Sequence, residues 1–180
     1  TFVKNEYLQL PANYEYLRDM LGTITMDAGD NMEIADYIRY YLQEITTKSD
    51  KVPTLPEGKD FVEYFLLESK TGYSAHYATA ATLLLRAAGV PARYVEGYLL
   101  SDKTWENNLP DEDGKYTVNV TDNEAHAWVE IYFDNYGWMP IEVTPGFYSG
   151  HLSLEGFEVE TVDPGDSDTI IVDEDSDIII

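Results

Sequence analysis

Three side chains of this sequence have the types needed for nucleophilic and acid–base chemistry: Ser74, His126 and Glu142. Imidazole is the usual general base near neutral pH, and the chain has only 3 histidines. Glu142 is the nearest carboxylate along the chain from His126 that could orient its ring from a neighbouring strand. Ser74 begins an apolar helical segment, so its hydroxyl is expected at the positive end of a helix dipole, which favours a nucleophile.

Local physics alone also offers structural explanations for these positions. Serine is among the best N-cap residues, and directly after Gly72-Tyr73 a cap is favoured over a nucleophile. Of the two remaining histidines, His76 is expected to belong to the helix start and His151 to a polar loop. On these grounds neither has a chemical role.

Whether His126 and Glu142 meet depends on the register of two expected strands. Alternation along the first strand places His126 and Glu130 on its less apolar face. A three-residue loop at 135–137 would set Glu142 opposite Glu130. His126 would then lie about four residues, or roughly 13 Å, away along the strand. Contact requires another register or a bulge, which Pro140 makes plausible because proline cannot donate to a ladder.

Helices are expected in the first half of the chain. Residues 1–12 are expected to be extended and 46–58 to form a loop. Asp30 and Glu33 have the spacing of a capping box, and apolar residues then recur at helical spacing. The segment 74–88 is so rich in Ala and Leu that it should be buried and central. The expected helices are 14–21, 31–45, a short one from 61, and 74–88.

After Pro91 the periodicity changes to two, which indicates strands. Residues 101–115 are expected to form a long exposed loop. Since helices precede strands, the fold class is α+β, with helices packed on one antiparallel sheet. The expected strands are 93–100, 116–120, 127–133 and 138–144.

The charge is strongly acidic, with 11 basic and 34 acidic residues and a net charge of −23. Such a surface repels phosphate backbones, so nucleic acid is not an expected partner. Residues 157–180 contain nine acids and no base. We therefore expect one domain over 1–156 and an acidic tail over 157–180 that is either an edge strand or disordered.

No cofactor or metal is expected. The chain has 0 Cys, which excludes disulfides, thiolate metal sites and a cysteine nucleophile. The acidic clusters 111–113 and 173–175 lack the ligand spacing of an EF-hand loop. Among the remaining notable residues, we expect Arg86 and Arg93 to anchor the central helix and the next strand, and Trp128 and Trp138 to be core or cleft wall.

Three segments resemble the signatures of bacterial transglutaminase-like domains, in the same order along the chain. They are Gly72-Tyr73-Ser74-Ala75-His76-Tyr77-Ala78 with the stretch 84–98, then His126-Ala127-Trp128-Val129-Glu130, then Gly137-Trp138 with Glu142-Val143-Thr144-Pro145. The resemblance covers roughly residues 55–147. It implies a papain-like fold, with a nucleophile on the buried helix and the histidine and acid on the sheet.

In this family the position of Ser74 is the catalytic Cys, that of His126 the general base, and that of Glu142 usually Asp. The serine is the severe departure. A thiol with a reference pKa of about 8.5 is held as thiolate by a helix N-terminus and His⁺, whereas a hydroxyl must lose its proton during attack. The flanking residues are consistent with a natural serine and equally with one introduced to silence the site.

The resemblance implies acyl transfer or hydrolysis at peptide or protein amide bonds, with weak or absent activity because of Ser74. It also implies an extracytoplasmic domain of a larger membrane-anchored bacterial protein, which the lack of an initiator Met and of a leader suits. The alternative is a non-catalytic module that binds a peptide or cell-wall ligand, with Ser74 as a helix cap. A true serine hydrolase would need oxyanion donors adapted to an oxygen nucleophile.

Overall fold

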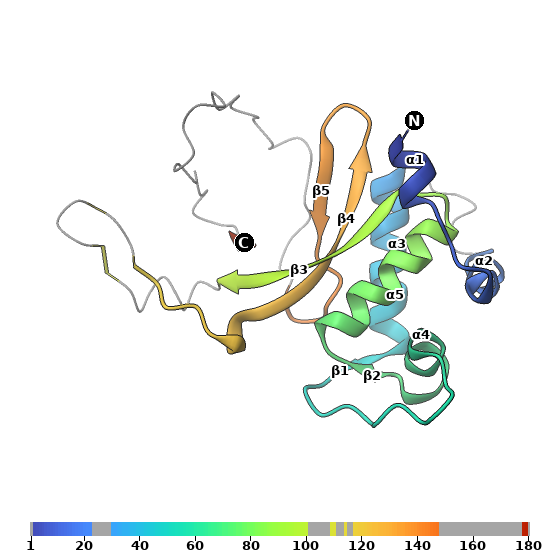
Figure 1. Cartoon of the computed structure of the whole chain (residues 1–180), viewed down its shortest axis with the longest axis horizontal. Coiled ribbons are helices and arrows are strands. Elements are labelled where there is room, and N and C mark those ends of the chain that lie inside the picture. The colour runs from blue at the N-terminus through green and yellow to red at the C-terminus, as the bar shows by residue number, and fades with distance from the viewer. Residues whose placement is uncertain are drawn as a thin grey trace. The chain divides into compact units, whose positions relative to one another are not determined.

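The computed structural model of the chain describes residues 2–22, 30–100, 109–110, 114, 117–147 and 178–179 (Figure 1). The chain divides into two compact units: Thr1–Glu96 with His126–Tyr148, and Gly97–Ala125 with Ser149–Ile180. All three expected site positions belong to the first unit. The expected domain boundary at residue 156 lies outside the described residues and stays a prediction.

The first unit begins with short helices. They are α1 (Phe2–Tyr7), the 3-10 turn η1 (Ala12–Tyr14) and α2 (Tyr16–Leu21). The helix expected at 14–21 is confirmed apart from its start, whereas the extended segment expected at 1–12 was wrong. The reason is that α1 buries no residue, so it leaves no apolar periodicity to detect.

The amphipathic helix α3 spans Asn31–Ile45, as its periodicity predicted. The Asp30 carboxylate accepts hydrogen bonds from the backbone N–H groups of Met32 and Glu33, at 2.8 and 2.9 Å. This cap satisfies two N–H groups that no helical carbonyl can reach. The buried residues Ala35, Ile38 and Leu42 join the core that α3 shares with α5.

The short helix α4 (Phe61–Glu63) begins at the expected residue, is capped by Asp60, and continues directly into a π-helix, η2 (Tyr64–Ser69). The wider π turn was not expected. It ends at Lys70, whose φ of 49° lies in the left-handed region. Segments of this kind are uncommon and occur often at functional sites.

Two short strands lie on either side of this helical segment. The strand β1 (Thr47–Lys48) pairs in parallel with β2 (Thr71–Gly72), so the loop expected over 46–58 was wrong at its first residues. A Cβ at Gly72 would lie 2.6 Å from Cβ of His76 and 2.8 Å from a ring carbon of Phe65. Glycine is therefore required here by close packing.

The central helix α5 spans Ser74–Ala87 and runs beside α3 (Figure 1). Its burial was expected and is confirmed. The chain leaves the helix through Gly89, whose φ is 85°. Side chains of α5 that are fully shielded from solvent include Tyr77, Ala80, Ala81, Leu84 and Leu85.

The larger sheet has the strand order β5-β4-β3-β6 within the described residues. The α+β class with an antiparallel sheet is confirmed. The expected strand at 116–120 was wrong, since 117–120 form no strand, and β5 ends three residues before the predicted end. The strands are β3 (Ala92–Leu100), β4 (Ala125–Phe133), β5 (Gly137–Ile141) and β6 (Ile178–Ile179).

The expected loop at 101–115 and most of the acidic tail lie outside the described residues. The last two described positions, Ile178 and Ile179, pair antiparallel with Leu100 and Leu99 of β3. At these two positions the tail forms an edge strand, one of the two possibilities that the sequence left open.

Candidate active site

The contact between His126 and Glu142, which sequence left undecided, is present. Nε2 of His126 lies 2.5 Å from Oε2 of Glu142, and the two residues are 5% and 8% exposed. An ionised carboxylate only accepts hydrogen bonds, so Nε2 is the donor in this contact, and in a neutral imidazole Nδ1 is then the acceptor nitrogen. The other carboxylate oxygen accepts the backbone N–H of Thr144 at 2.6 Å. Glu142 is thus fixed, and it fixes the imidazole in turn.

The strand register explains how the two side chains meet. Glu130 pairs with Pro140, so its predicted pairing with Glu142 was wrong. The hairpin loop starts one residue earlier than expected. The same register, extended by one residue, would place Glu142 opposite Trp128, with His126 as the diagonal neighbour. Diagonal positions on one face are about 7–8 Å apart, a gap that two long side chains span.

The side chains of β4 alternate between an apolar face and a face that carries His126, as the sequence pattern predicted. Ala127, Val129 and Ile131 belong to or border the buried core, while the opposite face carries His126. Beside it lies Trp128, whose buried indole N–H has no hydrogen-bond partner within the described residues. Because one face of β4 packs against the core, His126 lies on the opposite face of the strand.

The arginines act as the anchors that sequence suggested. Arg93 contacts the Glu130 carboxylate through Nε at 2.6 Å and Nη2 at 2.5 Å, and its guanidinium lies over the Trp138 ring. Arg86 donates to the carbonyl oxygens of Ala92 and Gln9. These contacts hold the central helix and the strands in place.

Sequence reasoning missed Phe147. Its ring centroid lies 4.4 Å from that of His126, and the Lys48 ammonium lies 4.1 Å from the centroid of the Phe147 ring. A turn at Gly146, with φ of 86°, brings Phe147 back over the imidazole. The run Thr144-Pro145-Gly146 was the available turn signal.

Ser74 is the first residue of α5, and Tyr73 is its N-cap. The prediction that Ser74 caps the helix was therefore wrong. The Ser74 hydroxyl forms no hydrogen bond with any described residue and is partly exposed. It lies in the first turn, among N–H groups without helical partners and at the positive end of the dipole.

The structure brings together two of the three expected site residues. His126 and Glu142 are in direct contact, whereas no hydrogen bond joins Ser74 to either. The assignment of all three to one catalytic site remains a prediction. Within the described residues, no cluster of three or more His, Asp or Glu side chains could hold a metal ion.

The other histidines differ from His126 in surroundings. His76 is buried at the start of α5, as expected, among the rings of Phe61, Phe65 and Tyr73. Burial lowers the pKa of His76. His151 lies outside the described residues, so its expected place in a polar loop stays a prediction.

Comparisons with known proteins agree with this architecture. The family model of the transglutaminase-like superfamily matches residues 18–143. The chain is 34% identical over 146 residues to the uncharacterized protein YebA of Bacillus subtilis. It is 39% identical over 87 residues to a protein-glutamine gamma-glutamyltransferase of Pseudomonas aeruginosa. These matches cover 79% and 48% of this chain, but only 19% and 12% of the two relatives.

A solved structure has a similar fold at a comparable level of identity. The periplasmic domain of TgpA from Pseudomonas aeruginosa superimposes with a TM-score of 0.58 and 29% identity. The match covers 78% of this chain and 46% of that one. A buried helix packed on an antiparallel sheet with a histidine–carboxylate pair defines a papain-like α+β core. The chain belongs to the transglutaminase-like superfamily.

No helix among the described residues has both the length and the apolar character needed to cross a bilayer.

Proposed function

We propose that this domain acts on amide bonds of peptides or proteins by acyl transfer or hydrolysis. In this proposal Ser74 occupies the nucleophile position, His126 is the base and Glu142 orients it. The observation that carries the proposal is the buried 2.5 Å contact between the last two. Because it occupies Nε2, it leaves Nδ1 of His126 for proton transfer, the arrangement that an activated nucleophile needs.

The reaction would proceed in two balanced halves. The Ser74 oxygen bonds to the amide carbon as its proton passes to Nδ1 of His126. The C–N bond then breaks, and His126 returns the proton to the departing ammonia or amine. An amine or water attacks the resulting ester, which gives a new amide or a carboxylate and restores the hydroxyl.

Serine makes the first half slow. A hydroxyl is not held as an oxyanion by a helix N-terminus, whereas a thiol in the same place ionises readily. We therefore propose weak or absent activity for this chain and activity for a Ser74→Cys variant. The likeness to a protein-glutamine gamma-glutamyltransferase supports a glutamine side chain as the amide attacked.

Ammonia release tests the proposal. The Ser74→Cys variant is expected to release ammonia from acetyl-Ala-Gln-Ala-amide, and the double variant with His126→Ala is expected not to. Release by neither variant would favour the alternative, a non-catalytic module that binds a peptide or cell-wall ligand. That alternative is supported by the serine itself, although Ser74 does not act as a cap.

We also propose that the domain is extracytoplasmic and part of a membrane-anchored protein. The likeness to a periplasmic domain supports this location. Protease added to intact cells that express the full-length parent protein is expected to cleave this domain. Cleavage only after lysis would contradict the proposed location.

A further inference from the structure

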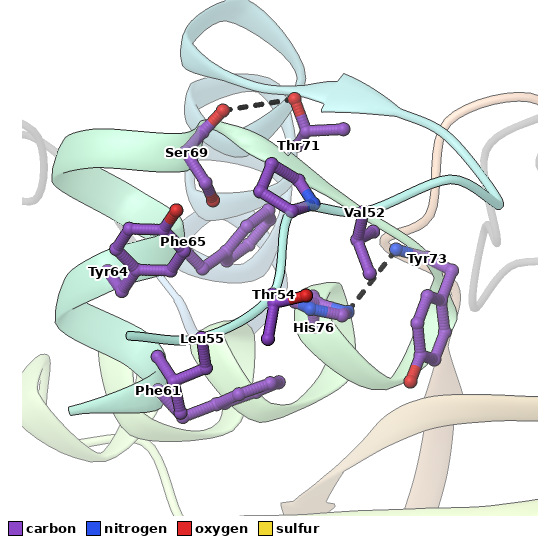
Figure 2. Close-up of a pocket in the computed structure, with 11 residues that line it drawn as sticks. Val52, Thr54, Leu55, Phe61, Tyr64, Phe65, Ser69, Thr71, Tyr73 and His76 are labelled. Carbon is purple, nitrogen blue, oxygen red and sulfur yellow. Dashed lines mark hydrogen bonds between the residues drawn. The ribbon is translucent and has the colours of Figure 1, made fainter. Parts of the chain in front are cut away.

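A pocket of about 280 Å³ lies beside the first turn of α5, and Figure 2 shows the residues that line it. Neither His126 nor Glu142 lines it, and neither does Ser74. Small-molecule pockets measure about 300–1,000 Å³, so this one suits a single side chain of a larger ligand. Its lining comprises Val52, Pro53, Thr54, Leu55, Phe61, Tyr64, Phe65, Ser69, Thr71, Tyr73 and His76.

Four Phe and Tyr side chains contribute to the walls of the pocket. Tyr64 and Phe65 come from the π-helix η2, Phe61 from α4, and Tyr73 from the N-cap of α5. Pro53, Thr54 and Leu55, which also line the pocket, are exposed. Aromatic rings pair favourably with a further ring in edge-on or offset arrangements. This lining therefore favours an aromatic occupant.

One N–H group at the pocket has no hydrogen-bond partner among the described residues. His76 is 8% exposed, and its Nδ1 accepts a hydrogen bond from the Tyr73 backbone N–H at 3.4 Å (Figure 2). Since Nδ1 accepts, the ring proton lies on Nε2. Nε2 donates to no described residue. This N–H is therefore available to donate a hydrogen bond to a ligand oxygen.

The pocket is next to the proposed nucleophile position. Tyr73 immediately precedes Ser74 in the chain, so their Cα atoms are about 3.8 Å apart. An extended peptide advances about 3.3 Å per residue. A substrate with its reacting amide at Ser74 could therefore place a neighbouring side chain at this pocket.

We propose that the pocket binds a tyrosine side chain of the peptide or protein substrate, one residue from the reacting glutamine. The aromatic walls hold the ring, and Nε2–H of His76 donates a hydrogen bond to its hydroxyl oxygen. This inference rests on the proposed function, because it takes Ser74 as the reacting position. It assigns a substrate preference that the His126–Glu142 pair does not explain.

Binding of three peptides to the unmodified chain tests the inference. The peptides are acetyl-Tyr-Gln-Tyr-amide, acetyl-Phe-Gln-Phe-amide and acetyl-Ala-Gln-Ala-amide, and calorimetry measures each Kd. We expect the tyrosine peptide to bind about tenfold more tightly than the alanine peptide, with phenylalanine between them. Equal affinity for all three would overturn the proposal.

A matched pair of variants locates the binding. Leu55 lines the pocket and is 40% exposed, whereas Leu67 is 48% exposed and does not line it. Leu55→Trp is expected to fill the pocket and weaken binding of the tyrosine peptide about tenfold. Leu67→Trp is expected to leave the affinity unchanged. Equal effects of the two substitutions would overturn the proposal.

The outcomes separate this inference from the proposed function. If Leu55→Trp does not change binding while Ser74→Cys releases ammonia, the pocket assignment fails and the reaction stands. If Ser74→Cys is inactive while the unmodified chain binds the tyrosine peptide through Leu55, the reaction fails and the binding preference stands.

Discussion

Glu142 directly follows β5 and contacts His126 near the start of β4, with Nε2 of His126 and Oε2 of Glu142 2.5 Å apart. The glutamate side chain is long enough to reach His126 with one carboxylate oxygen and accept the Thr144 N–H with the other. The shorter Asp that the family usually carries would approach from the same backbone position with less reach.

Removing the Glu142 carboxylate should impair the orientation of the His126 ring. In the Ser74→Cys background, Glu142→Gln is expected to reduce kcat/KM for ammonia release by about 10²–10⁴-fold, because the imidazole loses its oriented tautomer. Kinetics on the glutamine peptide measures the loss. Unchanged kcat/KM would show that Glu142 has only a structural role.

The contact between the Phe147 ring and the His126 imidazole can be tested separately. Phe147→Ala removes the ring packed on His126 and is expected to lower the free energy of unfolding by about 0.5–1.5 kcal/mol. Tyr136→Ala, at an exposed loop position, serves as the control and should change little. Urea denaturation measures both. Equal values for the two variants would mean that Phe147 does not contribute through this contact.

Gly72 offers a test of the packing around the start of α5. Gly72→Ala places a Cβ 2.6 Å from His76 and should destabilise the fold by about 1–3 kcal/mol. Gly22→Ala is the matched control, since its new Cβ would come no closer than 3.4 Å to any neighbour. Thermal unfolding of the two variants measures the difference. A Tm for Gly72→Ala equal to that of Gly22→Ala would contradict the packing argument.

Acid should destabilise the fold partly through His76. Burial lowers the pKa of His76 below its usual 6.5, so the unfolded chain binds the proton more tightly than the folded one. This contribution is fully present above pH 6.5 and is lost as the pH falls through the lower folded value. The His76→Asn variant, whose amide oxygen can replace Nδ1 as acceptor, should lose less stability between pH 7.5 and pH 5. Urea midpoints at both values measure this, and identical losses would contradict it.

Much of the fold could be predicted from the sequence, because buried faces of helices and strands carry apolar residues at regular spacing. The apolar stripe of α3 and the Ala- and Leu-rich run of α5 gave both helices nearly to their ends. The α1 helix left no such pattern because it buries nothing. The change from α4 to a π-helix depends on tertiary packing around Phe65, which no local signal encodes.

The sequence predicted the site only in part, because the pairing register of β4 and β5 could not be derived from it. Strand alternation put His126 on the correct face, but a hairpin loop shifted by one residue moved Glu142 by two positions relative to β4. Capping statistics also misled, since they favoured Ser74 as a cap where Tyr73 holds that position. Phe147 was missed because its contact with His126 depends on a turn after the last strand.

The central claim is that residue 74 occupies a nucleophile position served by His126. The chain has 0 Cys, so Ser74→Cys introduces its only thiol. The rate of alkylation by iodoacetamide against pH gives the apparent pKa of that thiol. Asn31→Cys, at the first residue of α3, provides a second helix start in the same chain for comparison.

We predict an apparent pKa for Ser74→Cys well below about 8.5 and below that of Asn31→Cys, because imidazolium and the helix N-terminus both favour thiolate. Adding His126→Ala should raise the pKa at position 74 and leave that at position 31 unchanged. If position 74 labels with an ordinary pKa that does not depend on His126, the catalytic interpretation of this site is wrong.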